Sequence, residues 1–171
     1  MVSQRRFRTP VGYARPRTGT TPPLASAKFG TDAAVPGVLA LTSIPWSTTL
    51  LASSDLVLDT TTAPDTPFVE VRRGGRYFVV LDTLLQNVSN ARKNSCVFLL
   101  AAPQDTLDFV VISAERTAYH RNVPVGLGSP RSSEVYEFAP HTRITGAVQA
   151  LNGSGGLTLL AEARLSVMEV G

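Results

Sequence analysis

The sequence predicts an all-β protein, a jelly-roll β-sandwich with an extended N-terminal arm. Short apolar runs recur at intervals of about 8–12 residues between clusters of turn-forming residues, which is typical of sandwiches and jelly rolls. Several of these runs alternate between apolar and polar residues, the period of a β-strand. The first 36 residues show neither a strand period nor a helical period. The chain has 171 residues, enough for one domain.

Residues 1–36 are predicted to form the extended arm. Residues 1–30 carry six basic residues and no acidic residue (+6), whereas the remaining residues carry 10 basic and 13 acidic residues (−3). Four prolines between residues 10 and 23 favour extended backbone. Arginines can pair with carboxylates or phosphates, and aromatic side chains can anchor in grooves. The candidate partner-binding residues are therefore Arg5, Arg6, Phe7, Arg8, Tyr13, Arg15, Arg17, Lys28 and Phe29.

Residues 37–171 are predicted to form the jelly-roll domain, and short strands fill its first half. Residues 60–67 are rich in Thr and Pro and are expected to form a loop. The Gly74-Gly75 pair suits a turn between two strands. The strand after this turn is apolar on both faces, so both faces are expected to be covered. The predicted strands are 38–42, 50–51, 56–58, 68–71 and 76–85.

The second half continues the pattern up to a strand at the C-terminus. The predicted strands are 96–100, 107–112, 134–138 and 143–151, with loops at 87–94 and 120–131. Residues 152–156 (Asn-Gly-Ser-Gly-Gly) are the strongest hairpin signal in the chain. The last run, 157–170, alternates like a strand, but its apolar residues also fit a helical period. A strand is favoured because the run follows a hairpin turn.

The sequence offers little for catalysis or metal binding. The single cysteine, Cys96, lies within an apolar run, where a thiol is inert. His120 and His141 are expected in surface loops without companion ligands. Glu134 and Glu137 would face opposite sides of one strand, which disfavours a joint acid–base role. We therefore expect no enzyme, no catalytic residues, no cofactor and no metal, and no apolar run is long enough to cross a membrane.

One segment resembles the jelly rolls of the C1q and tumour necrosis factor (TNF) families. It runs Phe68-Val-Glu-Val71, Gly74-Gly75, Tyr77 and Val79, and the Gly-rich hairpin followed by a last long strand is also similar. The resemblance covers residues 37–171 and departs from the family at 139–142, where a Gly-Asp turn is usual. It implies a ten-strand jelly roll and a homotrimer. Near the trimer axis we expect the aromatic residues Tyr77, Tyr136 and Phe138, for which an ordinary place in the core is an equal alternative.

Trimers of this fold commonly serve as binding heads, spikes and decoration proteins of phage capsids, and the arm resembles those of capsid and capsid cement proteins. The resemblance implies a structural virion protein at the capsid surface of a bacteriophage. It would be a decoration protein that trimerises and staples subunits of the major capsid protein through its arm. One alternative is a small coat protein whose arm faces nucleic acid. Another is the receptor- or glycan-binding head of a phage fibre, with binding loops at 60–67, 87–95 and 120–133.

Overall fold

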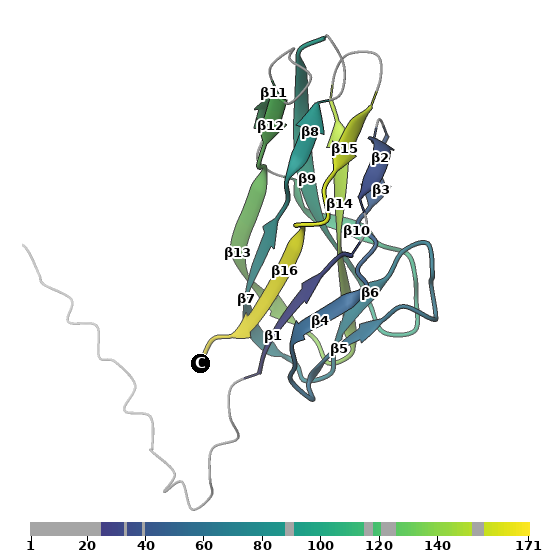
Figure 1. The fold of residues 1–171 in the computed structure, drawn as a ribbon. Helices are drawn as coiled ribbons and strands as arrows, with labels where there is room; N and C mark the ends of the chain where they lie inside the picture. The colour runs from purple at the N-terminus through teal and green to yellow at the C-terminus, as the bar shows by residue number, and fades with distance from the viewer. Residues whose placement is uncertain are drawn as a thin grey trace, which may run out of the picture.

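The computed structural model describes residues 25–32, 34–38, 40–87, 91–114, 118–120, 126–151 and 156–171, and every regular element within these ranges is a β-strand (Figure 1). The strands pair antiparallel throughout and form two main sheets with a smaller sheet at one end. The all-β jelly-roll class predicted from the sequence is confirmed. These ranges contain no helix that could cross a membrane.

The first main sheet has five strands in the order β13-β7-β16-β1-β4. It joins the first described strand to the last one, since β1 pairs with β16 along its whole length. The strands are β1 (Ser26–Gly30), β4 (Thr48–Leu51), β7 (Gly75–Asp82), β13 (Arg131–Phe138) and β16 (Arg164–Glu169). β13 and β4 are the edge strands of this sheet.

The second main sheet has seven strands, and β14 pairs with β9 over eight register positions at its centre. Its members are β3 (Thr42–Ser43), β5 (Leu56–Asp59), β6 (Phe68–Val71), β9 (Lys93–Ala102), β10 (Val110–Ala114), β11 (Ala118–His120) and β14 (Thr142–Ala150). The smaller sheet has the order β12-β8-β15-β2 and lies at the end away from the C-terminus (Figure 1). Its strands are β2 (Val35–Val38), β8 (Leu85–Asn87), β12 (Gly126–Gly128) and β15 (Leu157–Leu159).

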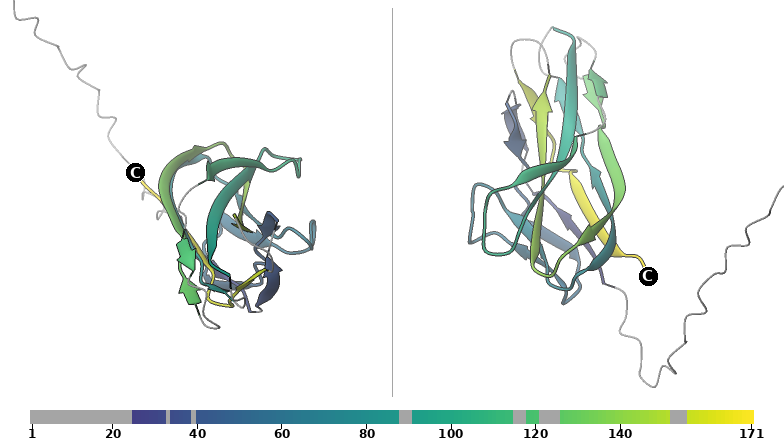
Figure 2. Two further views of the ribbon diagram at one scale, coloured as in Figure 1. Left: turned by 90° about the horizontal axis from the view of Figure 1, so that it is seen from above. Right: turned by 180° about the vertical axis from the view of Figure 1, so that it is seen from behind.

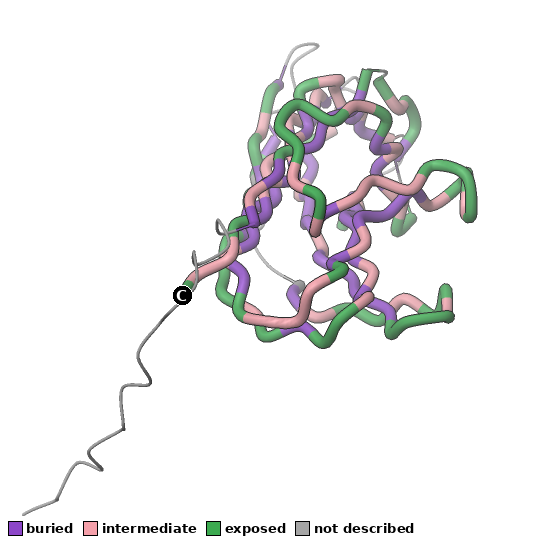
Figure 3. Tube along the Cα trace, turned by 90° about the horizontal axis from the view of Figure 1, so that it is seen from below, coloured by how far each residue is buried: buried purple, intermediate pink, exposed green. Residues whose placement is uncertain are grey.

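The core lies between the sheets, which enclose it when the molecule is seen along its length (Figure 2). Alternation along β7 decides which side chains enter the core: Tyr77, Val79 and Leu81 are fully buried, while Phe78 faces the other side. Buried residues alternate with less buried ones along the strands, and exposed residues gather on the connecting loops (Figure 3). Trp46 is fully buried, and its indole Nε1–H donates to Thr145 Oγ1 at 3.3 Å.

The predicted boundary between arm and domain, at residues 36 and 37, is wrong. β1 lies inside the predicted arm, yet it occupies a central place in the five-stranded sheet between β16 and β4. Ala25, Ala27 and Phe29 alternate into the core, and Phe29 is fully buried. The body therefore includes the chain from Ala25 onwards, and residues 1–24 lie outside the described residues.

Two further predictions need smaller corrections. The predicted strand 76–85 is two strands, β7 and β8, because the chain leaves the five-stranded sheet at Thr83 and joins the smaller sheet at Leu85. The last run is confirmed as strand rather than helix, and it is divided between β15 and β16. Most of the predicted hairpin at 152–156 lies outside the described residues.

Candidate docking surfaces

An apolar groove opens along one side of the sandwich, where the edge strands of the two main sheets face each other. β13 contributes one wall, and β10 with the end of β9 contributes the other. The groove has a volume of about 740 Å³, within the range of sites that bind small molecules or peptide side chains. Its lining residues are Ala101, Ala102, Pro103, Gln104, Val110, Ile112, Tyr136, Glu137, Phe138, Ala139, Pro140 and Thr142.

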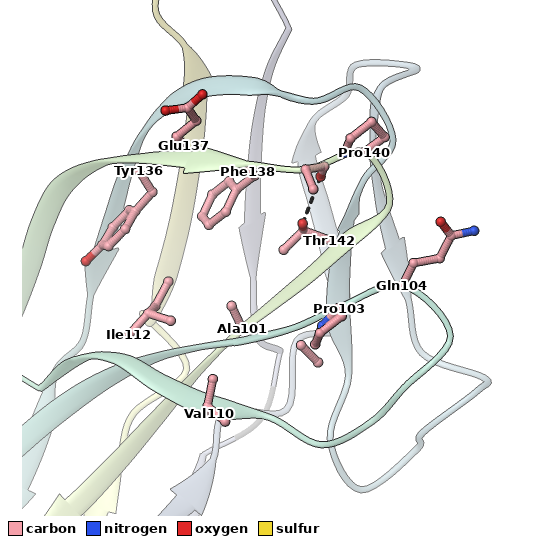
Figure 4. Close-up of a pocket in the computed structure, with 12 residues that line it drawn as sticks. Ala101, Pro103, Gln104, Val110, Ile112, Tyr136, Glu137, Phe138, Pro140 and Thr142 are labelled. Carbon is pink, nitrogen blue, oxygen red and sulfur yellow. Dashed lines mark hydrogen bonds between the residues drawn. The ribbon is translucent and has the colours of Figure 1, made fainter.

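Two stacked aromatic rings form the β13 wall. The centroids of Tyr136 and Phe138 lie 5.7 Å apart with an interplanar angle of 13°, and both side chains point into the groove towards Ile112 and Val110 (Figure 4). The Tyr136 hydroxyl donates to Glu134 Oε2 at 2.9 Å. Because alternate residues of a strand share a face, a carboxylate and two aromatic rings follow one another along this edge.

The turn between β13 and β14 closes one end of the groove and is held in a fixed shape. Pro140 packs so closely on Gly74 that a Cβ at position 74 would lie 2.7 Å from Pro140 Cδ. His141 adopts a left-handed backbone conformation (φ 62°), and its Nδ1 lies 2.8 Å from Glu70 Oε1. This hydrogen bond lowers the pKa of Glu70, because it favours the ionised carboxylate. The turn stands where the C1q/TNF-like jelly rolls usually have Gly-Asp.

A second apolar surface lies on the outer face of the five-stranded sheet. Val135, Phe78 and Met168 occupy one register line across β13, β7 and β16. The exposed fractions are 44% for Val135 and 39% for Met168, and Phe78 is half-buried. We call these three residues the outer apolar line. An aromatic ring and a methionine side by side on a sheet face are typical of the centre of a protein interface.

A charged cluster holds the two ends of the body together beside this line. The Ala25 amide donates to Glu169 Oε2 at 2.9 Å, and the Arg73 guanidinium donates to the same oxygen. Arg73 also pairs with Asp55, and its carbonyl accepts the Tyr77 hydroxyl at 2.6 Å. Burial and the nearby charge of Glu169 raise the pKa of Tyr77, so its hydroxyl stays protonated. The cluster fixes the point at which residues 1–24 join the body.

The opposite end of the sandwich buries polar groups instead. His120 is fully buried on β11, and its Nε2 lies 2.7 Å from Ser95 Oγ. A Cβ on Gly128 would lie 2.4 Å from the His120 ring, so only glycine fits there. Burial lowers the pKa of His120, because a charged imidazolium would lose its hydration. The prediction that His120 is a surface histidine is therefore wrong.

The structure separates the residues that the sequence singled out. Tyr77 is fully buried in the core of its own chain, where no partner can reach it, so its predicted place at a trimer interface is corrected. Phe29 is likewise a core residue and not a docking residue. Tyr136 is half-buried and lines the groove, Phe138 lines it as a buried residue of the core, and Lys28 is exposed on β1. The predicted partner-binding residues outside the described ranges are Arg5, Arg6, Phe7, Arg8, Tyr13, Arg15 and Arg17.

Within the described ranges, no group of three or more His, Cys, Asp or Glu side chains could hold a metal ion. Cys96 is a buried thiol, as expected from its apolar run. The outer apolar line was not predicted, although the alternation of residues 76–85 places Phe78 on the face opposite Tyr77. The groove was not predicted either, because its walls are 24 or more residues apart in the sequence and no local pattern joins Val110 to Tyr136.

No protein-family model matches the chain, and no curated protein matches it. Its fold is similar to solved structures of tumour necrosis factor-like proteins. Eiger TNF from S. frugiperda is 14% identical, with a TM-score of 0.57 over 87% of this chain and 94% of that one. Murine APRIL at pH 8.0 is 13% identical, with a TM-score of 0.59 over 86% of this chain and all of that one. Murine APRIL at pH 5.0 is 14% identical, with a TM-score of 0.56 over 86% of this chain and all of that one. The similarity establishes a TNF-like jelly-roll fold.

Proposed function

We propose that the protein is a structural, non-catalytic protein of a bacteriophage virion. In this proposal it is a decoration protein on the capsid surface that forms a homotrimer and binds the major capsid protein through residues 1–24. The observation that carries the self-association is the outer apolar line, three apolar side chains in register on a sheet face. Three copies rather than two are proposed because the sequence resembles the C1q/TNF-like trimers.

The outer apolar line suits an interface between copies of this chain. The next register line continues inward with Val80, which is flanked by the small polar residues Ser133 and Ser166. The face is therefore apolar at its centre and bears no charge on either of these two lines across β13, β7 and β16. Interface centres are depleted in charged residues and enriched in Phe and Met.

The N-terminal segment would leave each copy beside this interface. Ser26 is the register partner of Met168, so the chain enters the body next to the outer apolar line. Residues 1–24 contain five arginines and no acidic residue. Three such segments on one trimer would bind neighbouring capsid subunits with an avidity far above that of a single segment, because the second and third contacts are intramolecular.

Self-association is tested by light scattering after size exclusion. Met168→Glu places a charge at the centre of the proposed interface and is expected to yield monomers at micromolar concentration. Leu41→Glu is the matched control, since Leu41 is 47% exposed and lies outside the five-stranded sheet. It is expected to remain trimeric. A monomeric wild-type protein, or a Met168→Glu variant that remains trimeric, would overturn the proposed interface.

Capsid binding is tested by removing residues 1–24 only, because a longer deletion would take away β1 and part of the core. The shortened trimer is expected to fold and to lose cosedimentation with capsids built from the major capsid protein of the same genome. Normal cosedimentation, or a genome that encodes no capsid protein, would contradict the proposal. A gel shift with random DNA or RNA that needs residues 1–24 would instead favour the nucleic-acid-facing alternative.

A further inference from the structure

The groove between β13 and β10 has an unusual combination of walls for an otherwise apolar hollow. Its β13 side presents a carboxylate, a phenol and a phenyl ring in sequence, at Glu134, Tyr136 and Phe138. Two prolines, Pro103 and Pro140, stand at its mouth, whereas the Glu137 carboxylate points away from it, on the side of β13 opposite Tyr136 and Phe138 (Figure 4). Aromatic-lined grooves of this kind take proline-rich segments, and acidic groups beside aromatic rings suit arginine.

Residues 1–24 of this chain have the matching chemistry. They contain five arginines, four prolines and the aromatic residues Phe7 and Tyr13, with no acidic residue. The sequence Arg15-Pro16-Arg17 places a proline between two cations. A proline ring can pack against the Tyr136–Phe138 stack while a flanking arginine pairs with Glu134, which lies on the same face of β13. The charges of the segment and of the groove are therefore complementary.

Residues 1–24 join the body close enough to the groove to reach it. Ser26 lies on the same register line as Met168, Phe78 and Val135, one residue before the Tyr136 wall. Three inter-strand spacings separate β1 from β13, or about 14 Å. Twenty-four extended residues span up to about 80 Å. The length of the segment therefore places no limit on reaching the groove of its own chain.

We propose that the groove binds residues 1–24 of the same chain, with prolines on the Tyr136–Phe138 stack and an arginine at Glu134. In the free protein this contact covers both the apolar groove and the cationic segment. A partner that takes the segment away, such as the capsid of the proposed function, must compete with the groove. The inference does not depend on that partner.

Trypsin tests the contact in the full chain, because it cleaves after arginine. Cleavage after Arg8 and Arg17 is followed by mass spectrometry and compared with a free peptide of residues 1–24. The wild-type chain is expected to be cut at least about tenfold more slowly, since cleavage needs the undocked state. Cleavage as fast as that of the free peptide would overturn the proposal.

Two adjacent valines on β10 supply a matched pair of variants. Val110 lines the groove and is 59% exposed, whereas Val111 is 46% exposed and does not line it. Val110→Arg, which blocks the mouth and adds like charge, is expected to abolish most of the protection. Val111→Arg adds the same residue on the other face and is expected to keep it. Equal loss of protection in both variants would count against the groove as the binding site.

Two more measurements test whether a variant has simply misfolded and whether the groove binds the segment of another copy. Glu134→Lys changes an exposed side chain and is expected to raise the cleavage rate about threefold or more, with an unchanged melting temperature. Tenfold dilution of the Met168→Glu variant, which is expected to be monomeric, is expected to leave the protection unchanged. Protection that falls on dilution would assign the groove to the segment of a neighbouring copy, and binding within one chain would then be wrong.

Discussion

The two ends of the sandwich are stabilised in different ways. Near Ala25 and the C-terminus, the core is filled by large apolar side chains such as Phe29 and Tyr77, supplied by β1 and β7. At the far end, β8, β9, β11 and β12 enclose Asn87, Lys93, Ser95 and His120, all fully buried. Apolar burial tolerates imperfect geometry, whereas buried polar groups depend on specific partners. The stability of the apolar end should therefore fall when a buried side chain is made smaller. The stability of the polar end should fall when a buried group changes its charge or shape.

Truncation of Phe29 is expected to give the largest effect. Phe29→Ala should reduce the apparent free energy of unfolding by about 3–5 kcal/mol, because it leaves a cavity between the sheets. Urea unfolding at fixed protein concentration, followed by the fluorescence of the single tryptophan, Trp46, measures it. Lys28→Ala, one residue away on the exposed face, should change it by less than about 0.5 kcal/mol. Equal effects would show that β1 is not part of the core.

Adding one methyl group at the polar end is expected to cost less. Gly128→Ala should destabilise the protein by about 1–3 kcal/mol, because the new Cβ overlaps the His120 ring. A double-mutant cycle with His120→Ala isolates this clash by urea unfolding. In the His120→Ala background the second substitution should cost much less. An additive cycle would mean that the close approach is not what limits residue 128.

Acidification is expected to act through His120 and to have the smallest effect. Its pKa is lowered in the folded protein, while the unfolded chain keeps the ordinary value of about 6.5. The unfolded state therefore binds the proton first, and stability falls as the pH drops below about 6.5. A protonated ring would also lie opposite Lys93, its register partner.

The measurement compares wild type with His120→Gln by urea unfolding between pH 5.5 and 7.5, above the range in which carboxylates titrate. As the pH falls, the wild type should lose more stability than the His120→Gln variant. His141→Gln serves as the control for the other histidine, whose Nδ1 bonds to Glu70 at the opposite end. A pH-independent difference would show that His120 stays neutral in both states.

The apolar end is the part that the sequence predicts well. Alternation alone gives the inward face of β7 and the fold class, because each residue's side is set by the strand period. β1 was missed since Ser26 to Gly30 lack the β-branched residues that mark a strand, although Ala25, Ala27 and Phe29 already alternate. The arginines and prolines upstream favoured an extended arm, so this alternation was not interpreted as a strand.

The polar end and the groove could not be predicted, for a different reason. His120 is buried because β9 and β12 bring Ser95 and Gly128 to it, and nothing near residue 120 in the sequence indicates either contact. The groove likewise exists only where the edges of two sheets meet. Both depend on pairing between distant segments, which local patterns in the sequence do not reveal.

The bond between the Ala25 amide and Glu169 brings the entry and exit of the folded body to one spot. A fluorescent reporter attached after Gly171 would lie within a few residues of Ala25, which directly follows the basic segment. Its anisotropy would follow whatever engages that segment, without any label on the segment itself. A cargo fused at the same place would be presented on the side from which the segment emerges.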